Sequence, residues 1–165
     1  MRSRVATFFE CKVRYEKVTE DGMPKKVTET YVVDAVSFGE AEKRIIEEMS
    51  HYTKGELSVA TLKIAQYKEV FFDDRDIADK WYKVKLAFIT IDEKTDKEKK
   101  SNVFYLLNAP SIQGAIRNIC EIMKETMIDY YTYNVSETPI MDVFEYKPQS
   151  EQEETSPDNG HDDKE

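Results

Sequence analysis

The chain has 165 residues, of which 40% are hydrophobic and 12% aromatic, so it can build one packed core. Its formal charge is −9, but residues 147–165 hold seven acids against two lysines, which leaves −4 for the rest. That mild acidity argues against broad, charge-driven binding to phosphate backbones. No apolar run approaches the roughly 20 residues that span a bilayer, and no signal-like segment follows the N-terminus. We therefore expect a cytoplasmic protein without a membrane partner.

The first unit begins with residues 9–15, where apolar and polar side chains alternate as in a strand with one wet face. A turn at 20–22 and a second strand over about 27–35 complete a hairpin. Ser37 and Glu40 fit a capping box and start a helix that ends near residue 50. We expect its buried stripe to contain Phe38, Ala41, Ile45 and Met49. A third strand is predicted from Leu57 or Val59 through Phe72.

The second unit repeats this order after an acidic joint at 73–80. It has a strand over 81–90, a charged turn, a strand over 102–108, a helix capped by Ser111, and a closing strand over 129–146. Pro139 interrupts the closing strand, since proline cannot donate to a ladder.

The two units also match residue by residue. YVVDAVSFGEAEKRIIEEM at 31–49 aligns with YLLNAPSIQGAIRNICEIM at 105–123 at a constant shift of 74. Residues 8–15 align with 81–88, and 69–71 with 142–144, both at a shift of 73. A repeat of this length predicts a supersecondary unit that needs its copy to bury its apolar face.

The predicted fold is therefore α+β. Tandem strand-strand-helix-strand repeats, at 8–72 and 81–146, form one pseudo-twofold domain with a mainly antiparallel sheet and two helices. Residues 1–7 are an N-terminal extension, and residues 147–165, which lack a large apolar side chain, are a disordered acidic tail.

The second helix is more apolar than the first. Ile112, Ile116 and Cys120 add to its stripe, so we expect burial on more than one side, within the chain or, alternatively, in a homodimer. Cys11 and Cys120 are both expected to be buried free thiols in a reducing compartment.

Catalytic and metal-binding patterns are not found in the sequence. The chain has two histidines, no C-x-x-C and no G-x-G, so we predict no catalytic residues, no metal and no cofactor. Asp73, Asp74 and Asp76 could gather a hard cation, but the loop lacks the glycine and glutamate of an EF-hand, which favours a solvated linker.

The candidate ligand-binding residues lie on the two opening strands. Lys12 and Arg14 in the first unit, and Lys83 and Lys85 in the second, are expected to project from equivalent surfaces, with Phe8 and Trp81 at the strand entrances. Aromatic rings beside cations suit single-stranded nucleic acid or a nucleotide. The competing interpretation, which we favour, is an ordinary solvated strand face with Phe8 and Trp81 at the edge of the core.

Two segments carry a resemblance to a known family. The strand FFECKVRY at 8–15 and the helix start VDAVSFGEAE at 33–42 resemble the opening of an uncharacterised family of small proteins from Bacteroidales bacteria and their phages, a domain of unknown function. The resemblance covers most of residues 8–146 and brings no catalytic residue, cofactor or substrate. It implies a phage or mobile-element accessory protein.

From the residues and the resemblance we predict a non-enzymatic module that binds an unknown protein or small molecule. A nucleic-acid or nucleotide-binding factor is the first alternative. An enzyme with dispersed acid and base residues is the last.

Overall fold

The computed structural model describes residues 1–147. Over that range the fold is α+β, as predicted, with two helices and nine strands in mostly antiparallel sheets. In chain order the elements are β1 (Arg2–Arg4), β2 (Phe8–Val18), β3 (Pro24–Asp34), α1 (Phe38–Ser50), β4 (Leu57–Ile64), β5 (Tyr67–Phe72), β6 (Lys80–Ile91), β7 (Glu98–Ala109), α2 (Ile112–Met123), β8 (Asp129–Glu137) and β9 (Ile140–Phe144).

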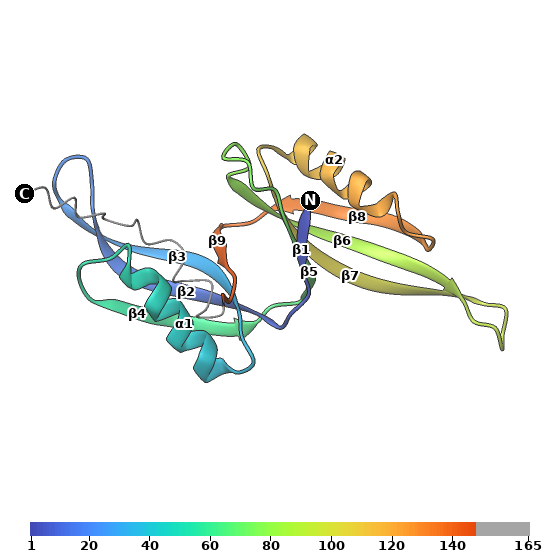
Figure 1. The fold of residues 1–165 in the computed structure, drawn as a ribbon, viewed down its shortest axis with the longest axis horizontal. Coiled ribbons are helices and arrows are strands. Elements are labelled where there is room, and N and C mark those ends of the chain that lie inside the picture. The colour runs from blue at the N-terminus through green and yellow to red at the C-terminus, as the bar shows by residue number, and fades with distance from the viewer. Residues whose placement is uncertain (148–165) are drawn as a thin grey trace, which may run out of the picture.

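The strands form two sheets. Sheet A has five strands in the order β1-β5-β7-β6-β8, and sheet B has four in the order β4-β2-β3-β9. The hairpins β2–β3 and β6–β7 are antiparallel, whereas β9 runs parallel to β3 and β5 runs parallel to β7. Strands β5 and β9, called here the crossing strands, thus each join the sheet built on the other hairpin (Figure 1).

The predicted third strand, from Leu57 or Val59 through Phe72, was wrong as a single element. It is two strands, β4 in sheet B and β5 in sheet A. Pairing in sheet B ends where the Ala65 N–H donates to the Phe8 carbonyl over 2.8 Å. Beyond that point the chain enters sheet A, where Val70 and Phe72 are buried. The interruption near Pro139, which separates β8 from β9, was predicted correctly.

Local signals in the sequence act where expected. Ser37 Oγ accepts from the Glu40 N–H over 3.2 Å, and Ser111 Oγ accepts from the Gly114 N–H over 3.1 Å, so both helices have the predicted caps. Gly22 takes a φ of 76° in the β2–β3 turn, where a side chain would be strained. Neither helix within residues 1–147 has the length and hydropathy to cross a membrane.

Each sheet turns one face toward its own helix. Between α1 and sheet B lie Phe9, Cys11, Val13, Tyr31, Val33, Ala35, Ala41, Ile45 and Met49. Between α2 and sheet A lie Phe71, Tyr82, Val84, Leu86, Val103, Tyr105, Leu107, Ala109, Ala115, Ile119 and Met123.

A third group of buried residues joins the two sheets. This junction cluster consists of Phe8, Val32, Tyr67, Val70, Phe72, Trp81, Leu106, Ile140 and Val143, most of them from the crossing strands and their neighbours. The helix-free face of each sheet is therefore covered at the junction and open beyond it (Figure 1).

Within residues 1–147 the second helix is buried on one side only, so the expectation of burial within the chain was wrong, and burial in a homodimer stays a prediction. Ile119 is 1% exposed, but Ile112 and Ile116 on the outer face are 42% and 45% exposed. Cys120 is exposed as well, whereas Cys11 is buried, and both are free thiols. A single layer of sheet covers only one stripe of a helix, and no second layer from residues 1–147 lies over α2 (Figure 1).

The N-terminal residues belong to sheet A. β1 pairs with β5, and Arg2 makes ion pairs with Asp74, after β5, and with Glu145, after β9. The Arg2 guanidinium also stacks over the Phe72 ring at 4.1 Å. This one side chain therefore contacts the ends of both crossing strands.

Candidate ligand-binding face

Two of the predicted residues lie together on the helix-free face of sheet A. Alternation along β6 directs Val84 and Leu86 toward α2, so Lys83 and Lys85 point the other way. In β7, Phe104 is paired with Lys85. In β8, Asn134 is paired with Lys85 on the opposite side. Three neighbouring strands therefore supply one continuous polar surface.

Each lysine on this face lies against an aromatic ring. Lys83 Nζ is 4.7 Å from the centroid of Phe104, Lys85 Nζ is 6.0 Å from that of Tyr133, and Lys100 Nζ is 5.6 Å from that of Tyr131. Such contacts hold a cation over a ring face. The tyrosine rings remain available, since Tyr131 is 54% and Tyr133 51% exposed.

The three lysines, with Phe104 and Tyr133, line a shallow open hollow of about 750 Å³. Its remaining lining is uncharged, and it contains no carboxylate; the residues are Lys83, Lys85, Lys100, Asn102, Phe104, Tyr133, Asn134 and Ser136. Locally the surface is cationic, although the chain as a whole is acidic. Lysine ammonium groups, amides and a hydroxyl can all donate hydrogen bonds, so the hollow suits an anion.

The other predicted residues lie elsewhere. Phe8 and Trp81 belong to the junction cluster and are 1% and 5% exposed, so neither ring can stack on a ligand from solvent. They sit in the core because the second sheet covers them. Lys12 and Arg14 are exposed on β2 in sheet B, on a different surface from Lys83 and Lys85.

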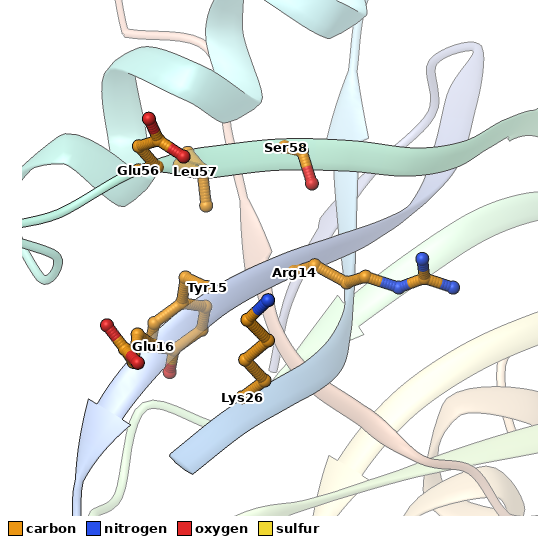
Figure 2. Close-up of a pocket in the computed structure, with 7 residues that line it drawn as sticks. All are labelled: Arg14, Tyr15, Glu16, Lys26, Glu56, Leu57 and Ser58. Carbon is orange, nitrogen blue, oxygen red and sulfur yellow. The ribbon is translucent and has the colours of Figure 1, made fainter. Parts of the chain in front are cut away.

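Arg14 lines a second open hollow of about 620 Å³ at the far end of sheet B. Figure 2 shows its seven residues, which are Arg14, Tyr15, Glu16, Lys26, Glu56, Leu57 and Ser58. Two cations and two carboxylates balance there, and the Arg14 guanidinium extends away from Glu16 and Glu56 (Figure 2). Tyr15 donates to Glu29, and burial with this hydrogen bond raises the Tyr15 pKa to about 12. The mixed charge makes this hollow a weaker candidate.

The junction between the sheets offers a third hollow, of about 230 Å³, lined by Glu10, Lys63, Ile64, Ala65, Gln66, Tyr67 and Lys83. Its one carboxylate, Glu10, pairs with Lys63 at 3.1 Å. Burial, with a smaller effect of the Glu10 charge, raises the Tyr67 pKa to about 12. The lining therefore lacks the pair of carboxylates that most glycoside hydrolases use.

The acidic joint is tied to arginines. Asp73 pairs with Arg75 and Asp74 pairs with Arg2, and these hydrogen bonds lower the pKa of both carboxyl groups. Within residues 1–147 no cluster of His, Cys, Asp and Glu is placed to hold a metal ion.

Four residues of this face were not predicted from the sequence, namely Lys100, Phe104, Tyr131 and Tyr133. A signal was present for Phe104, since it alternates with Asn102 along the predicted strand over 102–108, but Lys100 was assigned to the charged turn before that strand. The pairing of β6 with both β7 and β8 could not be read from that alternation, and only this pairing gathers the lysines beside the rings.

Comparison with known proteins gives one family. The model of a domain of unknown function, DUF4494, matches residues 7–146. The chain belongs to this family. The DUF4494 match covers every element from β2 to β9 and therefore includes the whole helix-free face of sheet A. A search of curated proteins gave no match.

Proposed function

We propose that this DUF4494 domain is a non-enzymatic binding module and that the helix-free face of sheet A holds its ligand. One observation carries the proposal: three lysines line one hollow that contains no carboxylate, and each of them lies against an aromatic ring. In a chain of net charge −9, such a surface favours an anionic ligand with a flat apolar part.

We also infer that the two halves are copies of one unit, in which each copy places its last strand in the other sheet. The matching register supports this. Tyr31 pairs with Asp142 in sheet B, and Tyr105 pairs with Glu69 in sheet A, so residues aligned at shifts of 74 and 73 occupy corresponding places. The helix-free face of sheet A would then differ in its charges from the corresponding face of the first copy. Lys83 stands where the first copy has Glu10, and Ala87 stands where it has Arg14.

The binding proposal is tested by titrating the full chain with short-chain inorganic polyphosphate and mapping amide shifts by NMR. We expect the largest shifts in β6, β7 and β8. The triple variant K83Q/K85Q/K100Q should lose these shifts. K43Q/K54Q/K94Q is the matched control, because it removes the same charge from exposed lysines elsewhere. Equal loss in both triple variants, or shifts spread over the whole surface, would contradict the proposal.

Self-association is a separate proposal, supported by the exposed Ile112 and Ile116 of α2. Sedimentation velocity tests it, because the substitution I116E should lower the sedimentation coefficient of a dimer and leave that of a monomer unchanged. A role as a phage or mobile-element accessory protein follows from the family resemblance alone and stays a prediction.

A further inference from the structure

We infer, building on the proposed function, that the ligand of the helix-free face of sheet A is single-stranded nucleic acid lying along β6. The ligand class follows from how the cations and rings alternate in space. It does not follow from total charge, which is negative.

The lysines form a row in the strand direction. Lys83 and Lys85 are alternate residues of β6, about 7 Å apart along the strand. Lys100 pairs with Ile89, four residues beyond Lys85, which adds about 13 Å. An extended single strand places successive phosphates at a spacing similar to that of alternate strand residues, so one strand can meet all three ammonium groups.

The rings lie where bases would stack. Tyr131 and Tyr133 stand half-exposed on β8, and Phe104 is half-buried on β7, each beside one of the lysines. Stacking uses the flat face of a base, which is accessible only when the base is unpaired. Open sheets with rings on the helix-free side are known to stack about two or three bases in this way. A duplex would present phosphates to the lysines and leave the rings unused.

The face also provides groups for base edges. Asn102, Asn134 and Ser136 line the same hollow and carry donors and acceptors. Ser136 and Asn134 on β8 pair with Lys83 and Lys85. Asn102 on β7 pairs with Ala87, two residues beyond Lys85, so all three polar groups stand beside the row of lysines. A surface that carried only cations would lack these donors and acceptors for base edges, so the polar lining favours a nucleic-acid site.

The test is fluorescence anisotropy of the full chain with labelled 12-nucleotide dT and U oligomers, at several salt concentrations. Labelled 12-base-pair DNA and labelled heparin are titrated in the same way. Three phosphate contacts predict a slope of log K against log salt of about −2, and K85Q should reduce it to about −1.4. Y133A should weaken binding roughly 5- to 150-fold, whereas Y133F, which keeps the ring, should retain it. The exposed controls K43Q and Y52A should bind as the wild type does.

The outcomes separate the two proposals. If heparin binds and needs the three lysines, but oligomers do not bind or do not need Tyr133, the anionic face stands and the nucleic-acid inference is overturned. Tighter binding of duplex than of single strand overturns it as well. If no probe binds, or K43Q weakens binding as much as K85Q, both proposals are overturned. Unchanged thermal unfolding of each variant confirms that the comparison is between folded proteins.

Discussion

Arg44 of α1 donates from Nη1 to Oδ1 of Asp34, at the end of β3, over 2.7 Å. The two side chains are only 10% and 4% exposed. The same carboxylate oxygen accepts the backbone N–H of Tyr146 over 2.7 Å, and Arg44 also donates to the Asp34 carbonyl. One buried ion pair thus joins helix to sheet and holds the chain just after the crossing strand β9.

The corresponding place in the other half has amides instead of charges. Asn108 Oδ1 accepts the backbone N–H of Asp73, just after β5, over 2.7 Å. Asn118 Nδ2 donates to the Asn108 carbonyl over 3.4 Å, as Arg44 does to that of Asp34. Asn108 and Asn118 align with Asp34 and Arg44 at the shift of 74. A neutral pair of amides therefore joins α2, sheet A and the chain after β5, as the ion pair joins α1, sheet B and the chain after β9.

Substituting Asp34 with alanine should lower the free energy of unfolding by about 3–5 kcal/mol, because it leaves the buried Arg44 charge without its partner. The double variant D34N/R44N, which copies the amide pair, should be more stable than either single variant. Recovery should be incomplete because Arg4 also faces Asp34, at 2.5 Å. Urea unfolding of the wild type, D34N, R44N and D34N/R44N measures this coupling, and the same measurement on D34A gives its loss of stability. K43A, at an exposed neighbouring position of α1, controls for changes in the helix. A loss below about 1 kcal/mol for D34A would contradict the assigned role.

Shortening an isoleucine side chain to alanine should have a large effect on stability on the inner face of α2 and a small one on its outer face. I119A should cost about 2–5 kcal/mol, because Ile119 is 1% exposed and packs against sheet A. I116A should stay within about 0.5 kcal/mol, because Ile116 is 45% exposed. Thermal and urea unfolding measure both values in one background. Similar losses for the two variants would mean that the outer face of α2 is covered in solution.

Much of this fold was predictable because its signals are local. The alternation of apolar and polar residues predicted β2 and β6, and Ser37 and Ser111 predicted where the two helices begin. The split between β4 and β5 was not predictable, because no proline stands at Ala65 as Pro139 does between β8 and β9. From the sequence, the apolar residues of β5 are equally consistent with a continuation of β4. Only their burial in sheet A shows that β5 is a separate strand.

The candidate face was half predictable for a related reason. Alternation placed Lys83 and Lys85 on the side away from the core, which is where they lie. The nucleic-acid alternative needed accessible rings at Phe8 and Trp81. The favoured interpretation placed both at the edge of the core, and contact between the sheets does bury them. The rings that do remain accessible, Tyr131 and Tyr133, come from a strand that joins this face only through its register with β6.

The two cysteines should differ sharply in reactivity. Cys11 is fully buried, and that burial raises its pKa to about 12, so little reactive thiolate forms near neutral pH. Cys120 is exposed on α2. Titration with a thiol reagent should label one cysteine per native chain and two in denaturant, and C120S should abolish native labelling. Rapid native labelling of C120S would show that sheet B opens at Cys11.

Stability should fall in alkali in part because of Tyr67, which lies in the junction cluster and is 8% exposed. Burial, with the Glu10 charge, raises its pKa to about 12, above the ordinary value of about 10. Between these values the unfolded chain has released the proton and the folded chain still holds it. The folded state therefore binds more protons, and the free energy of unfolding decreases as the pH rises through this window. One such group contributes at most roughly 1.4 kcal/mol per pH unit.

Urea unfolding of Y67F between about pH 9 and pH 12 should show a shallower decline than the wild type. Parallel declines would mean that the Tyr67 hydroxyl ionises without opening the junction between the sheets.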